Sequence, residues 1–191
     1  AQCFTLCARA LGYDVRIVYD WTDHVWTEVY SESQQRWLHC DSCENAMDTP
    51  LLYEAGWGKK LNYIIAFSLY EVFDVTQRYT HKYTEVQTRR NLVPEDWLAE
   101  VIAQAHSTKY SRLTPELQEK LHKWRKVDLE EFRVNRELDK EEEARRVKEE
   151  EKIGRISGSE EWRAERGELG DIEKTKAAEE KQEEIKKELT E

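Results

Sequence analysis

Two runs of residues, 24–30 and 36–40, constrain the fold of this chain more than any other feature. Polar and apolar side chains alternate along the first run, and the second run follows after the polar loop 31–35, which predicts a β-hairpin. His24 stands at the head of the first strand and Asp41 at the end of the second. The hairpin lets the carboxylate accept a hydrogen bond from one imidazole nitrogen, which fixes the tautomer and stabilises the imidazolium ion. We therefore predict that His24 and Asp41 are a base and its orienting acid, and the alternative that His24 is a structural residue stays open at this point.

A cysteine-bearing helix is predicted immediately before these strands. Apolar residues recur at helical spacing over residues 3–11, and Gly12 follows as a C-cap. Thiols on a helix near a His–Asp pair favour a hydrolase in which a thiolate attacks a carbonyl carbon. Further strands are expected at 15–19, 61–68 and 72–76, and residues 45–50 are expected to be irregular.

The second half of the chain has a different composition. Residues 91–191 carry 21 Lys and Arg and 28 Asp and Glu, nearly half of that segment, which favours solvated helices. Pro94 opens one predicted helix, and Thr114 as the N-cap with Pro115 at the first helical position opens another.

The second of these helices is expected to be long. It contains no Gly or Pro before about Lys152 and is predicted to continue to that residue, with a solvated part over 140–152. The Lys- and Glu-rich tail 171–191 is expected to be helical, or frayed in the absence of a partner.

Charge and hydropathy argue against several classes of protein. The net charge is −10 without a basic patch, so nucleic-acid binding is not expected. No apolar run reaches the ~18–20 residues that span a bilayer, so no membrane partner is expected. All four Cys precede residue 44 and do not resemble a secreted disulfide framework, so we expect a reducing, cytoplasmic location.

Several stretches of the sequence resemble the catalytic core of cytosolic peptide:N-glycanases. They read Cys-Phe-Thr-Leu-Cys-x-Arg-Ala-Leu-Gly, Asp-x-Thr-Asp-His-Val-Trp-Thr-Glu-Val-Tyr-Ser and Arg-Trp-Leu-His-Cys-Asp-x-Cys-Glu. Pro-Leu-Leu-Tyr-Glu-x-Gly-Trp-Gly-Lys-Lys-Leu-x-Tyr-Ile-Ile-Ala-Phe-Ser follows at 50–68, and Asp-Val-Thr-x-Arg-Tyr at 74–79. Residues 154–168 resemble the entry to the family's C-terminal glycan-binding region. Several long motifs in the family's order are far more specific than one short motif.

The resemblance implies an α+β fold. A transglutaminase-like (papain-like) core with an antiparallel sheet packed against the N-terminal helix would be followed by a mostly helical C-terminal extension. The expected domains are the catalytic core over 1–90, the helical extension over 91–152, and the start of the glycan-binding region with its charged tail over 153–191.

The implied activity is an amidase that removes N-linked glycans by hydrolysing the glycosylated Asn side-chain amide with a Cys-His-Asp mechanism. Its implied partners are misfolded N-glycoproteins and the ubiquitin receptors that shuttle proteins to the proteasome. Two alternatives stay open: a cysteine protease or transglutaminase-like enzyme with the same triad, and an inactive helical scaffold.

The attacking thiol is expected to lie outside this sequence. In the family motif Cys-Gly-Glu-Trp-Ala-x-Cys-Phe-Thr-Leu-Cys the catalytic Cys comes first, and Ala1 aligns with the Ala after Trp. The sequence is therefore interpreted as a truncated chain that starts just after the nucleophile. Cys3 aligns with the second Cys and is expected to be a small buried residue. The alternative, in which the helix dipole makes Cys3 the nucleophile, stays open.

The cysteines also permit a metal hypothesis. Cys3, Cys7, Cys40 and Cys43 could form a four-thiolate zinc site. We expect no metal there, because Cys-x-x-x-Cys on a helix is a poor zinc knuckle and Asp41 has the role described above. By resemblance, the family's structural zinc is held by residues upstream of the first residue, and no other cofactor is implied.

Six further side chains are expected to bind the substrate by resemblance. Arg16, Trp26, Glu28 and Trp37 would line the active cleft, and Glu44 and Trp57 would lie near the chitobiose. Aromatic faces stack on sugar rings, and charges orient their N-acetyl and hydroxyl groups. The alternative is that the hairpin tryptophans are core residues stacked across strands. Asp23 and His39 lie near the catalytic pair and are expected to point to the opposite face of the sheet.

Overall fold

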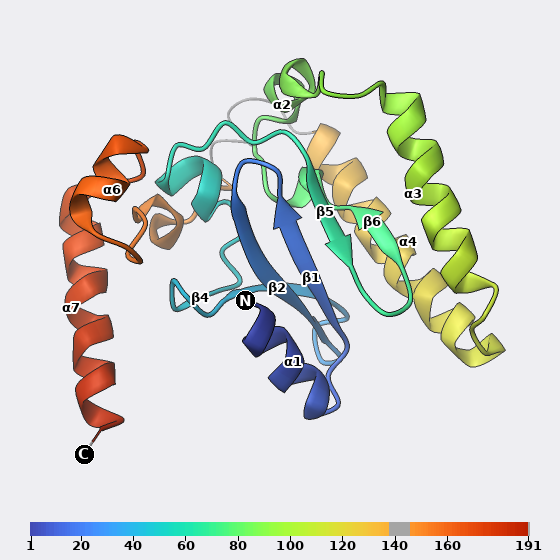
Figure 1. The fold of residues 1–191 in the computed structure, drawn as a ribbon, viewed down its shortest axis with the longest axis horizontal. Coiled ribbons are helices and arrows are strands. Elements are labelled where there is room, and N and C mark those ends of the chain that lie inside the picture. The colour runs from blue at the N-terminus through green and yellow to red at the C-terminus, as the bar shows by residue number, and fades with distance from the viewer. Residues whose placement is uncertain (138–145, 191) are drawn as a thin grey trace.

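The computed structural model describes residues 1–137 and 146–190, and its centre is one antiparallel sheet with helices on both faces (Figure 1). The sheet has six strands in the order β4-β3-β2-β1-β5-β6. The strands are β1 Val15–Asp20, β2 His24–Ser31, β3 Arg36–Asp41, β4 Ala46–Met47, β5 Ile64–Phe67 and β6 Val72–Asp74. All neighbouring strands are antiparallel, as predicted. The short strand β4 was not expected, because two residues carry no periodicity.

The predicted hairpin is confirmed as β2 and β3. In its register Glu28 lies opposite His39 and Thr27 opposite Cys40. On the other side of β2, the first strand places Arg16 opposite Glu28. Because side chains alternate along a strand, polar groups from three adjacent strands share one face of the sheet.

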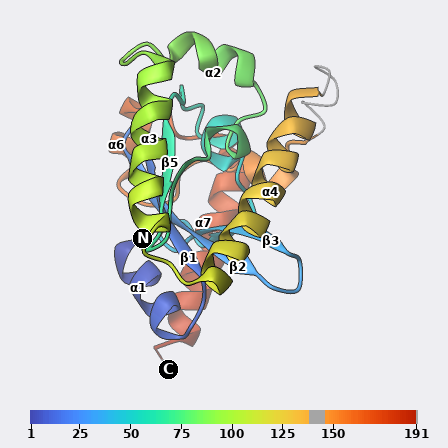
Figure 2. The same ribbon diagram turned by 90° about the vertical axis from the view of Figure 1, so that its right-hand side faces the viewer.

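Helices cover the two faces of this sheet. Figure 2 shows α1 (Gln2–Ala10) on one side and α4 (Pro115–Glu137) on the other. The remaining α-helices are α2 Tyr83–Arg89, α3 Glu95–Tyr110, α6 Glu160–Glu165 and α7 Ile172–Glu188. Three shorter turns are η1 Leu52–Gly56, a π-helical turn, and the 3-10 turns η2 Thr76–Arg78 and η3 Glu149–Lys152. No helix in the described part of the chain is long and apolar enough to cross a membrane.

The helical second half of the chain contributes directly to the core. Phe132 of α4 joins the main cluster of buried apolar residues, which also contains Trp26, Tyr53 and Trp57. Trp124 of α4 belongs to a second cluster with hairpin residues. Residue 90 therefore does not mark the edge of the buried core.

The long helix is shorter than its composition predicts. Of the solvated part expected over 140–152, residues 140–145 lie outside the described residues, and the segment 149–152 is a 3-10 turn and not an α-helix. Glu151 is buried there, and its carboxylate accepts hydrogen bonds from the backbone N–H groups of Leu51 at 2.9 Å and Lys148 at 2.9 Å. Tertiary contacts that satisfy these amides override the helical propensity of a Glu- and Lys-rich segment.

The C-terminal segment is tied to the core through closely approaching backbones. Ile153 forms isolated β-bridges with Gly170 and Asp171. A Cβ atom on Gly56 would lie 2.1 Å from the carbonyl oxygen of Ile153, so only glycine permits this approach. The tail beyond this point forms α7, whose N-cap Asp171 accepts a hydrogen bond from the backbone of Lys174. This confirms the helical expectation for the tail.

Candidate active site

The hairpin brings His24 and Asp41 together. His24 begins β2 and Asp41 ends β3, and Nε2 of the imidazole lies 2.7 Å from Oδ2 of the carboxylate. The predicted hydrogen bond between the two side chains is confirmed. Their side chains are 7% and 0% exposed, respectively, so the interaction is shielded from water. A hydrogen bond at this distance holds Nε2 as the protonated nitrogen, and Nδ1 is then the free base.

Three donors surround the carboxylate of Asp41. Besides His24, the hydroxyl of Tyr53 donates to Oδ2 at 3.0 Å, and the backbone N–H of Cys43 donates to Oδ1 at 3.0 Å. Burial alone raises the pKa of Asp41, but the hydrogen bond and charge of His24, together with the amide of Cys43, lower it below its usual range. Asp41 is therefore an ionised acceptor at neutral pH.

Aromatic rings fix the orientation of the His24 imidazole. Ring centroids of Trp57, Tyr53 and Trp26 lie 4.9, 5.1 and 5.8 Å from the centroid of the imidazole. Nδ1 of His24 forms no hydrogen bond with any other residue that the structure describes. The geometry thus leaves one imidazole nitrogen available to accept a proton.

The expected position of His39 was wrong. His39 is two residues before Asp41 on β3, so both side chains project from the same face of the strand. Its Nε2 lies 2.6 Å from the hydroxyl of Tyr53. Burial lowers the pKa of His39 to about 4, so the ring is neutral at physiological pH. Asp23 lies in the turn before His24 with a positive φ and pairs with Arg166 at 3.4 Å.

Comparison with known proteins identifies the family. The family described as the Rad4 transglutaminase-like domain matches residues 21–145, which is well over half of the chain. The chain belongs to this family. A crystal structure of Rad4–Rad23 bound to a 6-4 photoproduct UV lesion is similar, with a TM-score of 0.51 and 18% identity over 71% of this chain and 33% of that chain. At this identity the likeness shows the fold alone, and it confirms the expected transglutaminase-like fold.

Several relatives with higher identity are amidases by name. The peptide-N(4)-(N-acetyl-beta-glucosaminyl)asparagine amidase of Gallus gallus is 51% identical over 91% of this chain. The amidases of the same name from Homo sapiens and Arabidopsis thaliana are 51% and 44% identical, each over 89% of this chain. The chain spans about a quarter of the length of these relatives. The resemblance to peptide:N-glycanases is confirmed.

Arg16 and Glu28 do not line an open cleft. Both are fully buried, with Nε of Arg16 2.7 Å from Oε2 of Glu28. Asp128 of α4 lies 2.9 Å from Nη1 of Arg16, and Arg78 lies 2.7 Å from Oε1 of Glu28 and also pairs with Asp128. The expectation that Arg16 and Glu28 line the cleft is corrected, because α4 covers them. Sequence reasoning missed Asp128, since a single Asp in a charged helix carries no signal of burial.

The tryptophans of the hairpin are core residues. Trp26 is 0% and Trp37 is 2% exposed. The ring of Trp26 stacks on Tyr53 with centroids 4.3 Å apart, and Trp37 lies beneath the guanidinium of Arg16 at 3.9 Å. These contacts favour the alternative that both tryptophans form the core. Trp57 is also buried, and its edge contacts His24, so it borders the dyad from within the protein.

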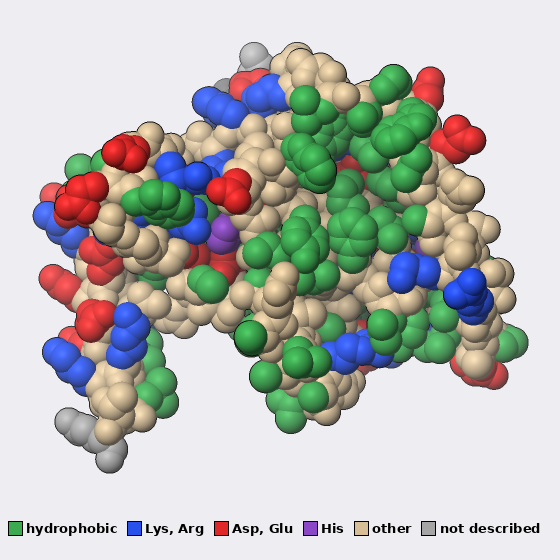
Figure 3. Space-filling view, viewed as in Figure 1, with side chains coloured by type: hydrophobic (Ala, Val, Ile, Leu, Met, Phe, Trp, Pro, Cys, Tyr) green, Lys and Arg blue, Asp and Glu red, His purple; other side chains and the backbone are tan. Residues whose placement is uncertain are grey.

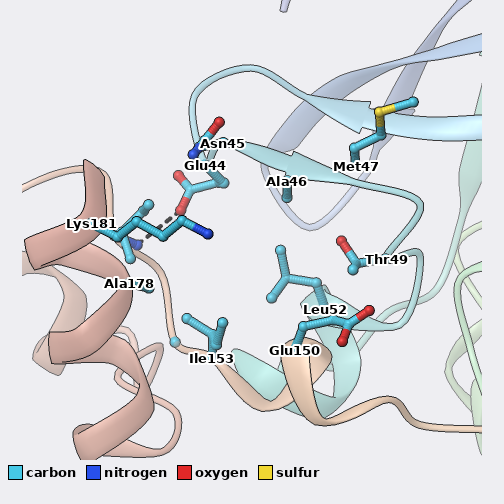
Figure 4. Close-up of a pocket in the computed structure, with 12 residues that line it drawn as sticks. Glu44, Asn45, Ala46, Met47, Thr49, Leu52, Glu150, Ile153, Ala178 and Lys181 are labelled. Carbon is cyan, nitrogen blue, oxygen red and sulfur yellow. Dashed lines mark hydrogen bonds between the residues drawn. The ribbon is translucent and has the colours of Figure 1, made fainter. Parts of the chain in front are cut away.

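Glu44 lines a pocket between the core and the C-terminal segment. Its Oε2 accepts a hydrogen bond from the backbone of Ile156 at 2.8 Å, which holds the C-terminal segment against the core. Figure 4 shows Glu44 and Lys181 on one side of this pocket and Leu52 and Ile153 at its base. The pocket has a volume of about 270 Å³. The expected side-chain role of Glu44 in substrate binding stays a prediction.

The cysteines occupy different environments. Cys40 is buried, and burial raises the pKa of its thiol to about 11. Cys3 and Cys7 are exposed, and the expectation that Cys3 is buried is corrected, because only Ala8 of α1 is buried against the sheet. Within the described residues no three His, Cys, Asp or Glu side chains are grouped as metal ligands. The family's structural zinc, whose ligands are expected upstream of the first residue, stays a prediction.

Proposed function

We propose that this chain carries the base and acid of an amidase that hydrolyses the bond between an N-linked glycan and its asparagine. The observation that carries the proposal is the 2.7 Å contact between Nε2 of His24 and Oδ2 of Asp41. The names of relatives with 51% identity over about nine tenths of the chain supply the substrate class. The substrates would be misfolded N-glycoproteins in the cytoplasm.

His24 and Asp41 support a covalent route through a thioester. His24 Nδ1 takes the proton of a cysteine thiol, and the thiolate attacks the side-chain amide carbon of the glycosylated asparagine. The carbon–nitrogen bond breaks as the imidazolium returns the proton to the leaving glycosylamine. Water then hydrolyses the thioester with His24 as the base, which leaves aspartate in the peptide and regenerates the thiol. Asp41 stabilises the imidazolium in both steps.

The attacking thiol is proposed to come from the cysteine that precedes Ala1 in the family motif. In the described residues, no sulfur of the four cysteines forms a hydrogen bond with His24. In the family motif Cys3 follows the first Cys by about six residues, ~9 Å of helical rise, whereas ~1 Å of misplacement costs about two orders of magnitude in rate. We expect the 191-residue chain to be inactive and a longer chain with the Cys-Gly-Glu-Trp motif to be active.

The test uses the longest natural chain that contains this sequence. A denatured glycopeptide should lose its glycan, and its glycosylated asparagine should become aspartate, which mass spectrometry detects as a defined mass change. Plain peptides and glutamine acceptors with amine donors should not react. Cleavage of the plain peptide, or cross-linking of the glutamine, would favour the protease or transglutaminase alternative. Retention of activity by the 191-residue chain and its loss on Cys3→Ser would assign the nucleophile to Cys3.

A second candidate function is suggested by α3. No residue of this helix is buried, and Trp97 and Val101 are 52% and 39% exposed. The groove between α3 and its neighbours is lined by apolar residues such as Ile102 and Leu129 and has a volume of about 380 Å³. Exposed apolar side chains beside a groove are typical of a docking surface. We infer a role in binding the ubiquitin receptors that shuttle proteins to the proteasome.

Docking can be tested by pull-down with a purified ubiquitin receptor. Trp97→Ser should abolish capture, whereas Ile172→Asp, at a 59% exposed site on α7, should leave capture unchanged. Equal capture by wild type and Trp97→Ser would remove α3 from the interface.

A further inference from the structure

A chain of buried hydrogen bonds continues from the dyad into the core. It runs from His24 through Asp41 and Tyr53 to His39, and it ends at the backbone N–H of Thr49. We propose that Tyr53 and His39 are positioning residues that hold Asp41, and through it the imidazole of His24, in the orientation needed for proton transfer. The positioning role follows from the geometry alone. Its effect on catalysis rests on the proposed hydrolysis.

The contacts determine where each proton lies. The backbone N–H of Thr49 donates to Nδ1 of His39 at 3.4 Å, so the neutral ring carries its proton on Nε2. That proton is donated to the Tyr53 oxygen 2.6 Å away. The Tyr53 hydroxyl proton is then free to be donated to Oδ2 of Asp41 at 3.0 Å. The reverse direction would leave two oxygen acceptors facing each other without a proton between them.

Burial keeps each member of the chain in the required protonation state. Tyr53 is 0% and His39 is 1% exposed. Burial raises the pKa of Tyr53 well above its usual value and lowers the pKa of His39 to about 4, so both are neutral at physiological pH. A neutral hydroxyl supports the carboxylate without adding a charge that would compete with the imidazolium.

The position of Tyr53 in the fold explains why its hydroxyl reaches the dyad. Tyr53 lies in the π-helical turn η1, and its ring stacks on Trp26 with centroids 4.3 Å apart. The same ring contacts His24 and Trp57 with centroids 5.1 and 5.0 Å away. A π-helical turn widens the backbone locally and is frequent at functional sites. The ring is thus packed on three sides, and its hydroxyl has a fixed direction.

The chain offers a matched control. Tyr79 is also 0% exposed, and its hydroxyl donates to Oε1 of the buried Glu28 at 2.8 Å, outside the dyad. Tyr53→Phe and Tyr79→Phe each remove one buried hydroxyl that donates to a carboxylate. A purely structural role for Tyr53 predicts similar effects from both substitutions. A positioning role predicts that only Tyr53→Phe alters His24.

The kinetic experiment uses the longest natural chain and a glycopeptide substrate. Tyr53→Phe should lower kcat about tenfold with KM changed less than about twofold, as is usual when a residue that orients a histidine is removed. His39→Leu should match it, and the double variant should lose no more than Tyr53→Phe alone, because both act through one contact. His39→Gln, which keeps an N–H donor, should restore most of kcat. Tyr79→Phe should retain wild-type kcat.

A second readout does not depend on activity. In nitrogen-15 spectra at neutral pH, His24 should be the Nε2–H tautomer, and its ring proton should exchange about tenfold faster in Tyr53→Phe than in Tyr79→Phe. Unchanged exchange in folded Tyr53→Phe would overturn the positioning role. Absence of amidase activity in the wild type, with the expected difference in exchange, would instead refute the proposed function and leave the positioning role standing.

Discussion

The same face of the sheet carries two buried polar networks that differ in how their hydrogen bonds are used. One consists of His24, Asp41, Tyr53 and His39, and it begins at the head of β2. The other lies further along β2 and is the ionic cluster of Arg16, Glu28, Arg78 and Asp128. In the cluster, each carboxylate oxygen of Glu28 and Asp128 accepts from a guanidinium group. In the dyad network, Nδ1 of His24 has no partner among the described residues.

This difference distinguishes the dyad network, a candidate catalytic site, from the ionic cluster, which stabilises the fold. Ion pairs of the cluster join β1, β2 and α4. Burial of these charges is unfavourable unless each has a partner of opposite charge. Arg16 and Arg78 lower the pKa of Glu28 even though burial raises it, so the carboxylate stays ionised inside the protein. In the dyad network, the donors to the buried carboxylate of Asp41 are a ring N–H, a hydroxyl and a backbone N–H. Proton transfer requires a nitrogen that is free to accept a proton and a ring that is held in place, and Nδ1 of His24 meets both conditions. Each of the four predictions below tests this contrast.

The largest effect is expected on the rate of hydrolysis when His24 is replaced. His24→Ala should reduce glycopeptide hydrolysis by the longest natural chain about 10²–10⁴-fold, the usual contribution of a general base. The free energy of unfolding should fall less than on loss of a cluster residue, because Tyr53 and the backbone N–H of Cys43 still donate to Asp41. Initial rates and urea unfolding measure the two quantities. His122→Ala, an exposed histidine on α4, is the control and should leave the rate unchanged. A residual rate near that of the wild type would remove His24 from the mechanism.

The next effect concerns the ionic cluster. Asp128→Ala removes the buried carboxylate that Arg16 and Arg78 share and leaves Glu28 to balance both buried cations, so the free energy of unfolding should fall by about 3–5 kcal/mol. Glu131→Ala also removes a partner of Arg78, but that carboxylate is 33% exposed, and its loss should cost at most about 1 kcal/mol. Urea denaturation of both variants measures the difference. Equal losses would show that the buried cluster does not hold α4 to the sheet.

The pH dependence of stability should reveal His39. Its pKa is lowered by burial from 6.5 in the unfolded chain to about 4 in the folded protein. Between these values the unfolded state binds the extra proton, so stability should fall as the pH drops from about 6.5 to about 4, by about 3 kcal/mol in total. Urea unfolding at closely spaced pH values measures this slope.

His39→Gln supplies the control for the pH dependence, since the amide does not titrate. Its stability should be flatter across the same window. Asp41, Glu28 and Asp128 have lowered pKa values in the folded state, so their contributions are lost only at lower pH, as they become protonated. The same slope in wild type and His39→Gln would mean that another group titrates in this window.

The smallest effect is expected where the C-terminal segment borders the dyad. The guanidinium of Arg155 lies 4.9 Å from the ring of Trp57 and 4.4 Å from that of Trp162. Arg155→Ala should cost about 1 kcal/mol and speed amide hydrogen exchange over the segment 154–170 more than over β2. Arg133→Ala, at an exposed ion pair of α4, should leave exchange unchanged. Uniform acceleration across the chain would indicate global destabilisation and no local role.

The exposed apolar surface shows that periodicity predicts the helices and strands but not which of their residues are buried. Figure 3 shows hydrophobic side chains gathered over the centre of one face, in the region of α1 and the sheet. Phe4, Leu6 and Tyr19 are 37%, 70% and 41% exposed, although the helical and strand patterns placed them correctly in α1 and β1. A pattern identifies which residues share a face, but burial depends on what covers that face.

The sequence by itself determined the hairpin, the His24–Asp41 contact and the family. These follow from alternation, from a short loop and from long motifs, all of which are local or collinear properties of the chain. Only the tertiary structure decided that Arg16 and Glu28 are buried with Asp128, which lies 112 residues beyond Arg16 along the chain. It also decided that Tyr53 donates to Asp41 and that His39 contacts Tyr53, because a π-helical turn and the sheet register set those directions. Partners brought together from distant segments leave no periodic signal, so charge pairing and burial emerge only once the helices pack on the sheet.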